Sequence, residues 1–195
     1  MLDQIDIDSL VIVKYPSPVL RKKCEPIATF DGSLGRLVER MCELMHAQKG
    51  VGLAGPQVGL PLRIFVWNAT GSPDGDRVSV NPILSEFDGQ VDAEEGCLSI
   101  PDVNVSVKRA VTAKMVAFDA TGLQYEVVGQ DLMARIWQHE NDHLDGRLIL
   151  DYQSPGEEIA HRKVLKELTA TYKKANPSKK AQTSKRSTST RGRRR

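Results

Sequence analysis

The stretch from Gln138 to His143, with the sequence Gln-His-Glu-Asn-Asp-His, contains residues whose types and spacing suit metal chemistry. In an α-helix, residues four apart lie on one face about a turn apart, so His139 and His143 could bind one metal ion together. Glu140 lies beside this pair, and its carboxylate could reach a water on that metal. This His-Glu-x-x-His pattern offers two ligands and a general base, and such a helix normally holds a metal that activates water. The alternative is an ordinary amphipathic helix with two hydrogen-bonded histidines.

A catalytic site of this kind usually has three protein ligands and one open position, so a third ligand must lie elsewhere. A histidine six residues after His143, as in the metzincin pattern, is excluded because position 149 is Ile149. A downstream ligand on the last helix, as in thermolysin-like proteases, would be Glu157, Glu158 or His161. The third candidate is Cys97, although a lone cysteine is more often a small buried hydrophobe. The residues alone leave the choice open.

Length and composition describe a globular protein with a short additional segment. The chain has 195 residues, of which 40% are hydrophobic, and no run approaches the 18 apolar residues of a membrane span. Asp3, Asp6 and Asp8 near the start are unlike a signal or transit peptide. Three cysteines, an odd number at no framework spacing, indicate a reducing compartment. We therefore expect a cytoplasmic protein.

Charge divides the chain into two parts. Residues 176–195 contain eight of the 27 basic residues and no acid, so residues 1–175 have 19 basic and 25 acidic residues, a net charge of −6. The basic segment has no apolar periodicity and is expected to be disordered. We predict a single catalytic domain over 1–175 and a basic tail over 176–195. Such a tail is usually a solvated run of charge, and weak contact with RNA is the functional alternative.

Hydrophobic periodicity predicts the elements that must position these groups. A helix is expected over residues 33–48, capped by Asp31 or Ser33. The metal helix should begin near Asp131 as N-cap and end at Gly146. A last helix should run from Ser154 to about residue 175, with the buried stripe Ile159, Leu165, Leu168 and Tyr172. Strands are expected over 62–67, 78–84 (broken by Pro82), 103–107, 111–118 and 123–128, the last two joined by a hairpin turn at 119–122. This mixture predicts an α+β fold.

The segment from Gly50 to Gly59 has four glycines in ten residues, which permit positive φ angles and close approach of the backbone to a ligand. It is not a phosphate-binding loop, since the Gly-Lys-Ser/Thr ending is missing. Two interpretations remain: a flexible loop, or the wall of a binding cleft with Gln57 offering an amide.

Three motifs in order resemble the peptide deformylase family. Gly50-Val51-Gly52-Leu53-Ala54-Gly55-Pro56-Gln57 is similar to its Gly-φ-Gly-φ-Ala-Ala-x-Gln, where φ is apolar. Glu95-Gly96-Cys97-Leu98-Ser99 matches Glu-Gly-Cys-φ-Ser, and Gln138 to His143 matches Gln-His-Glu-φ-Asp-His. The resemblance covers about residues 11–170. It implies antiparallel strands wrapped around a central metal-binding helix, with an N-terminal and a C-terminal helix.

The resemblance also implies the chemistry: hydrolysis of the formyl group from the N-formylmethionine of newly made polypeptides. Cys97, His139 and His143 would bind one divalent metal, usually iron(II) in the family, although zinc, nickel or cobalt can occupy such a site. Glu140 would be the base, and the Gln57 amide with the Leu98 N–H would stabilise the oxyanion. The backbone of Gly50, Val51 and Gly52 would hold the peptide as an added strand. A pocket near Val51, Leu132 and Ile136 would take the methionine side chain.

Several further expectations follow from the motifs. Asp142, Glu95 and Arg109 are candidates to support the ligating histidines. Gly55 departs from the second alanine of the family motif, which is expected to loosen the loop. Asn141 departs from the usual apolar residue and should point away from the ligand face.

Two rival functions remain. A thermolysin-like zinc endopeptidase would keep its metal when Cys97 is changed. A non-catalytic metal-binding or RNA-binding protein would tolerate a change at Glu140.

Overall fold

The fold is α+β, as expected, with two antiparallel sheets and three α-helices. The computed structural model describes residues 2–177. The helices are α1 (Gly32–Ala47), α2 (Leu132–Leu144) and α3 (Pro155–Ala175). The strands are β1 (Gly52–Ala54), β2 (Ile64–Trp67), β3 (Arg77–Asp88), β4 (Val91–Cys97), β5 (Ile100–Arg109), β6 (Thr112–Phe118) and β7 (Gln124–Gln130). Short 3₁₀ helices are η1 (Leu2–Gln4), η2 (Ile7–Ser9), η3 (Pro18–Arg21), η4 (Gly55–Val58), η5 (Pro73–Gly75) and η6 (Ile149–Tyr152). The basic tail lies outside the described residues from 178 on.

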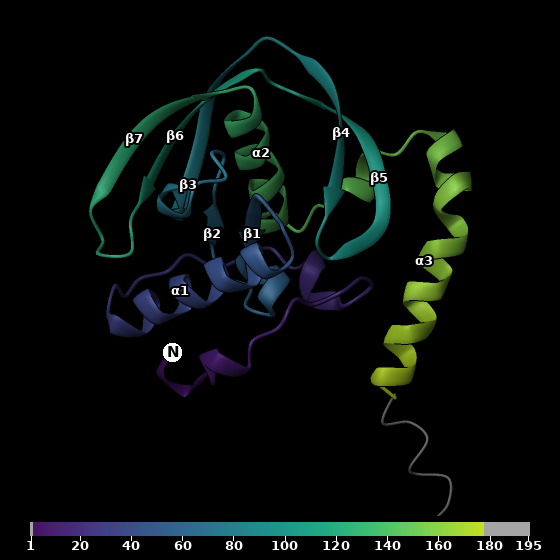
Figure 1. Cartoon of the computed structure of the whole chain (residues 1–195), viewed down its shortest axis with the longest axis horizontal. Helices are drawn as coiled ribbons and strands as arrows, with labels where there is room; N and C mark the ends of the chain where they lie inside the picture. The colour runs from purple at the N-terminus through teal and green to yellow at the C-terminus, as the bar shows by residue number, and fades with distance from the viewer. Residues whose placement is uncertain (1, 178–195) are drawn as a thin grey trace, which may run out of the picture.

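Five strands form one sheet in the order β1-β2-β3-β6-β7, and β4 pairs with β5 in a separate hairpin (Figure 1). The predicted strands are present. The prediction for β3 needs one correction, because this strand is not broken at Pro82 and continues to Asp88. Its register shifts between Val80 and Ile83, and Asn81 there has a φ of 51°. A proline is tolerated where a bulge interrupts the ladder.

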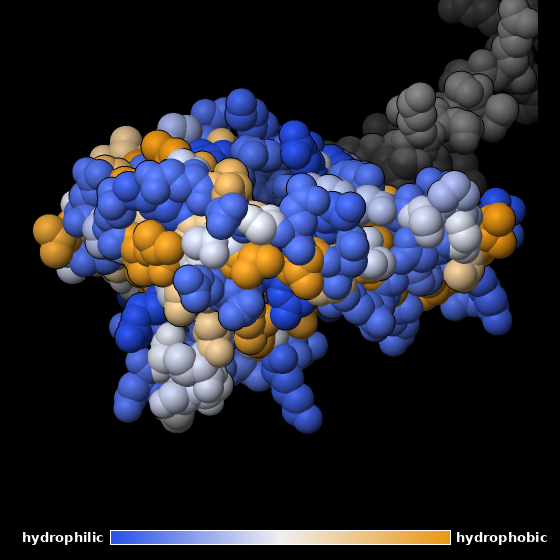
Figure 2. Space-filling model, turned by 90° about the horizontal axis from the view of Figure 1, so that it is seen from above, coloured by the Kyte–Doolittle hydropathy of each residue, from blue (hydrophilic) through white to orange (hydrophobic). Residues whose placement is uncertain are grey.

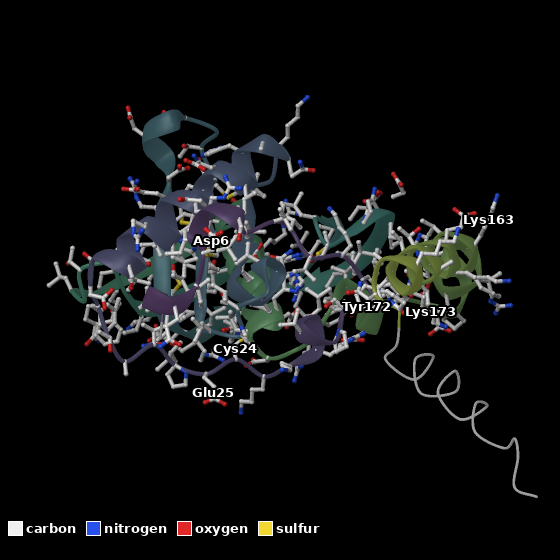
Figure 3. The ribbon with its side chains drawn as sticks, turned by 90° about the horizontal axis from the view of Figure 1, so that it is seen from below. Asp6, Cys24, Glu25, Lys163, Tyr172 and Lys173 are labelled. Carbon is white, nitrogen blue, oxygen red and sulfur yellow. The ribbon has the colours of Figure 1, made fainter. Side chains whose placement is uncertain are left out.

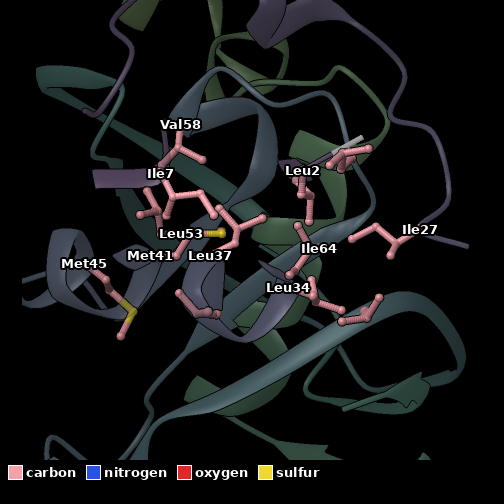
Figure 4. Packing of buried hydrophobic residues seen from close by; sticks show 13 residues of the cluster. Leu2, Ile7, Ile27, Leu34, Leu37, Met41, Met45, Leu53, Val58 and Ile64 are labelled. Carbon is pink, nitrogen blue, oxygen red and sulfur yellow. The ribbon is translucent and has the colours of Figure 1, made fainter. Parts of the chain in front are cut away.

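Helix α1 packs its apolar face against the β1–β2 end of the sheet. Leu34, Leu37, Met41 and Met45 are completely buried there, and Figure 4 shows them among residues from the sheet and the N-terminal segment. Asp31 caps the helix as predicted, because its carboxylate accepts hydrogen bonds from the N–H groups of the first turn. This packing fixes the chain that leads out of α1 into the glycine-rich segment.

The glycine-rich segment is not a flexible loop. It forms β1 and η4, and residues 52–58 are all buried. Of the two interpretations, the wall of a cleft is therefore the one that the structure supports.

Helix α2 carries the His-Glu-x-x-His motif and lies across the sheet, in contact with β1, β2, β3, β6 and β7 (Figure 1). Trp137 is completely buried and meets Trp67 edge to face, with 5.4 Å between ring centroids. Gly129 of β7 leaves room for the Trp137 ring, since a Cβ at this position would lie 2.5 Å from the ring. Asp131 is the N-cap of α2, as predicted, but its side chain makes no capping hydrogen bond.

The β4–β5 hairpin and helix α3 form the remaining part. Val103, Val105 and Val107 face a third apolar cluster that also contains Leu20 and Ile100. Helix α3 packs Val164, Leu165 and Leu168 against this cluster, but none of its residues is fully buried. The predicted buried stripe is therefore wrong at Ile159, which is 66% exposed, while Leu165, Leu168 and Tyr172 are only half-buried. Figure 3 shows α3 at the periphery with Lys163 pointing away from the body.

The exposed surface is mainly hydrophilic, with apolar residues scattered over the face seen in Figure 2. Among residues 2–177, no helix combines the length and the apolar character needed to cross a membrane.

Candidate metal centre and active-site cleft

Three potential ligand atoms converge between β4 and α2. The atoms of Cys97, His139 and His143 lie within 4.8 Å of one another, and within the described residues this is the one such group. Cys97 Sγ lies 3.3 Å from His143 Nε2. Cys97 ends β4, while the histidines lie one helical turn apart on α2. The candidate ligands of the thermolysin-like alternative, Glu157, Glu158 and His161, are not part of this group. Glu157 accepts from the N–H groups of Ser106 and Ser154, and His161 contacts Gln153.

The orientation of His139 is set by a buried carboxylate. Glu95 Oε2 lies 3.0 Å from His139 Nδ1, which leaves Nε2 free to face a metal. Arg109 donates to both Glu95 oxygens at 2.9 Å, and both side chains are almost completely buried. Burial alone would raise the pKa of Glu95, but the hydrogen bonds from His139 and Arg109 outweigh it and lower the pKa to about 2.

Asp142 forms its hydrogen bonds with Arg109 and Tyr152 and not with either candidate ligand histidine, which corrects one expectation. Its carboxylate accepts from Arg109 Nη1 at 2.6 Å and from the Tyr152 hydroxyl at 2.8 Å. Arg109 also lies 5.0 Å above the Tyr152 ring. Asp142 therefore supports His139 only through Arg109 and Glu95. Tyr152 was not anticipated, and no sequence motif marks it.

Glu140 is buried beside the ligand cluster and is 3% exposed. Within residues 2–177, its Oε2 atom meets no hydrogen-bond partner. Burial raises the pKa of this carboxyl group to about 7. Gly52 lies directly against it, and an added Cβ would overlap Oε1 and lie 2.8 Å from the carboxyl carbon. The glycine is therefore required by the carboxylate, a contact that the motif alone did not reveal.

Gln57 is held in place from two sides. Its Oε1 atom accepts from the Ala54 N–H at 2.7 Å, while Nε2 lies 3.5 Å from Cys97 Sγ and 3.4 Å from Ser99 Oγ. The side-chain amide donor is thus directed at the ligand cluster. Leu98 follows Cys97 in the two-residue turn that joins β4 to β5. Both groups expected to bind an oxyanion therefore adjoin the cluster.

A cleft of about 470 Å³ opens beside this cluster. Among its lining residues are nearly all those predicted from the sequence, namely Gly50, Val51, Gly52, Gln57, Cys97, Leu98, Leu132, Ile136, His139 and Glu140. His143 is completely buried and lies behind them. The apolar part of the wall is accessible, since Val51 is 46% and Leu132 is 39% exposed.

Both departures from the family motif have a structural context. A Cβ at Gly55 would lie 2.7 Å from the Leu62 carbonyl oxygen and 2.8 Å from that of Leu60. The glycine thus allows tight packing, which corrects the expectation of a looser loop. Asn141 accepts from Arg63 at 3.2 Å and so joins α2 to the chain beside β2.

The donor set fits a divalent cation. A thiolate and two imidazoles are ligands that several such metals accept. Burial holds the pKa of His143 well below its ordinary value, which favours the neutral imidazole that a metal ligand requires. Hydrogen bonds with Cys97 and Glu95 outweigh burial and raise the pKa of His139. Surroundings that stabilise a proton on this imidazole also stabilise a cation in its place.

The fold and this cluster, with a buried carboxylate beside an open cleft, define a metal-dependent hydrolase. The family model described as polypeptide deformylase matches residues 9–158. The peptide deformylase of Thermotoga petrophila is 40% identical over 161 residues, which are 82% of this chain and 96% of the relative.

Solved structures agree with this match. A Plasmodium falciparum peptide deformylase superimposes with a TM-score of 0.81 at 36% identity, covering 86% of this chain and 99% of that one. The Arabidopsis thaliana peptide deformylase 1B superimposes with a TM-score of 0.81 at 38% identity, covering 86% and 94%. The chain belongs to the polypeptide deformylase family.

Proposed function

We propose that this site hydrolyses the formyl group from the N-formylmethionine of newly made polypeptides and releases formate. One observation carries the assignment: the Glu140 carboxylate lies buried beside the Cys97, His139 and His143 cluster, at the wall of an accessible cleft. Membership of the deformylase family selects the formyl amide from the bonds that such a site could hydrolyse.

The positions of the residues support a role for each. Cys97, His139 and His143 would hold a divalent ion, which as a Lewis acid polarises the formyl oxygen and makes water more acidic. Glu140 takes a proton from the attacking water and delivers it to the leaving amine as the carbon–nitrogen bond breaks. Gln57 Nε2 and the Leu98 N–H donate hydrogen bonds to the oxyanion of the tetrahedral intermediate.

The cleft accounts for recognition of a peptide with a methionine side chain. Strand β1 is at the edge of the five-stranded sheet, and the backbone of Gly50 to Gly52 lines the cleft. An extended substrate can therefore pair with this backbone as an added strand, whatever its later side chains. Val51, Leu132 and Ile136 supply apolar surface for the methionine side chain.

We propose iron(II) as the native metal, with zinc, nickel or cobalt as substitutes. The resemblance supports iron, whereas the ligand types suit all four ions. A cytoplasmic location is supported by the cysteines: Cys24, Cys42 and Cys97 are all free, and a reducing compartment leaves a thiolate free to bind metal.

We propose further that the catalytic domain comprises residues 1–175 and that the basic segment 176–195 makes weak contact with the RNA of the ribosome. The support is the charge of this segment, eight basic residues and no acid, which follows α3 directly. Sedimentation with ribosomes at low salt tests this contact. Equal binding by a variant truncated after Ala175 would refute it.

The main experiment measures formate release from a short formyl-Met peptide by protein loaded with iron(II) without oxygen. The parent should turn over, and Glu140→Ala and Cys97→Ala should both lose activity. Cys97→Ala should also lose the metal, whereas Glu140→Ala should retain it. If the parent releases no formate and Cys97→Ala still binds metal, the proposal fails.

A further inference from the structure

Three consecutive residues of the N-terminal segment each hold the backbone of a residue at the proposed oxyanion site. We call Val13, Lys14 and Tyr15 the N-terminal arm. The Val13 N–H donates to the carbonyl of Gln57 at 2.8 Å, and the Tyr15 N–H donates to the carbonyl of Ser99 at 2.9 Å. Between them, Lys14 Nζ donates to the carbonyl of Leu98 at 2.6 Å.

The geometry of the β4–β5 turn explains why these contacts matter. Cys97 pairs with Ile100, so Leu98 and Ser99 are the two turn residues between the paired positions. The register of the ladder shifts between Gly96 and Cys97, so strand pairing is irregular at this end of the hairpin. The arm binds the carbonyl groups of both turn residues. The arm engages carbonyl groups of the turn and not the Leu98 N–H.

We propose that Lys14 is a positioning residue for this reaction, and that its ammonium group ties down the Leu98–Ser99 turn so that the Leu98 N–H is aligned for the oxyanion. This inference rests on the proposed function. Gln57, the other donor, is bound by the arm through Val13 and is directed at the same place. The arm, which precedes both donors by more than 40 residues in the chain, thus contacts the backbone of both donor residues.

Lys14 is the part of the arm that substitution can test. The Val13 and Tyr15 bonds come from backbone N–H groups, which any residue except proline supplies. The Lys14 bond comes from a charged side chain, and hydrogen bonds from charged donors are about twice as strong as neutral ones. An oxyanion donor displaced by a fraction of an ångström is strongly impaired, because its effect depends on preorganised geometry.

The test compares Lys14→Met, Lys14→Arg and the control Lys23→Met, which alters an exposed lysine in the same segment. All are loaded with iron(II) and assayed on the same formyl-Met peptide, and bound metal is quantified. Lys14→Met should lower kcat about 10-fold and change KM less than about twofold, because removal of one oxyanion donor altogether costs about 100- to 1,000-fold. Lys14→Arg should recover most of kcat, and the control should match the parent.

Amide hydrogen exchange of the metal-loaded proteins gives a readout independent of activity. In Lys14→Met, exchange should accelerate about 10-fold in the peptide that contains the Leu98–Ser99 turn, with no change in α1 or β6. Unchanged kcat and exchange in Lys14→Met would overturn the proposal. So would loss of kcat in proportion to lost metal, or faster exchange throughout with a lower Tm, since either result shows a merely structural role. An inactive parent would instead count against the proposed function, and the exchange comparison would still decide whether Lys14 orders the turn.

Discussion

Replacing Glu95 with glutamine removes one negative charge from a buried network while preserving the shape of the side chain. This carboxylate accepts from Arg109 at two positions and from His139, and its side chain is 8% exposed. Loss of the charge leaves the Arg109 guanidinium less well compensated in a buried place. Breaking a buried pair in this way usually costs about 3–5 kcal/mol.

The lowered pKa of Glu95 gives a second, independent value for its contribution to the free energy of unfolding. The difference between the ordinary glutamate value of 4.5 and about 2 in the folded protein corresponds to about 3 kcal/mol at neutral pH. Because folding lowers this pKa, the contribution is fully present above pH 4.5 and is lost as pH falls from 4.5 towards 2. Glu95→Gln should therefore lower the free energy of unfolding by about 3 kcal/mol at pH 7. The stability curves of parent and variant should converge below pH 4.5.

Urea denaturation with a metal chelator present measures this difference between pH 7 and pH 3 without a contribution from bound metal. The matched control is Glu43→Gln, whose carboxylate is 66% exposed and pairs with Arg40 on α1. An exposed pair is worth about 0–1 kcal/mol, so the control should stay close to the parent. Metal affinity of Glu95→Gln should fall about 10- to 100-fold, since His139 loses its orienting partner. A variant within 1 kcal/mol of the parent at pH 7, or a difference that does not change between pH 5 and pH 3, would refute the reasoning.

Three further substitutions test separate contacts. Gly52→Ala should displace the Glu140 carboxylate and lower kcat about 100-fold or more, while the bound metal stays unchanged. Formate release and metal analysis measure these two results, and a kcat equal to that of the parent would contradict the assigned contact. Gly55→Ala should lower the free energy of unfolding by about 1–3 kcal/mol, because the methyl group meets two backbone carbonyls; an unchanged urea midpoint would show that the backbone yields freely. Asp131→Gly should raise the Tm, because Asp131 has φ 49° and ψ −118° and makes no capping bond; a lower Tm would reveal an unrecognised role for its side chain.

The sequence predicted most of the secondary structure, and the misses have physical causes. Strand β4 was not predicted as a strand, because Asp92, Glu94 and Glu95 give it a polar composition. It is stabilised by pairing with β5 across seven positions, which no local pattern records. Ile159 was assigned to a buried stripe because periodicity gives a face of a helix and not how much of that face is covered. The apolar packing of helix α3 against the body involves Val164, Leu165 and Leu168, and Ile159 lies outside it.

By itself the sequence placed two potential metal ligands on one helical face, since the spacing of His139 and His143 is a local property of the α-helix. It also placed Glu140 beside them, and the three motifs identified the family. The tertiary structure decided what local spacing cannot: that Cys97, 42 residues before His139, meets the histidines, and that Glu95 reaches His139 through the β4–β5 hairpin. The contacts of Gly52 with Glu140 and of Lys14 with Leu98 likewise join segments far apart in the chain. Such contacts depend on how sheets and helices pack, because only packing brings distant backbone and side-chain atoms together.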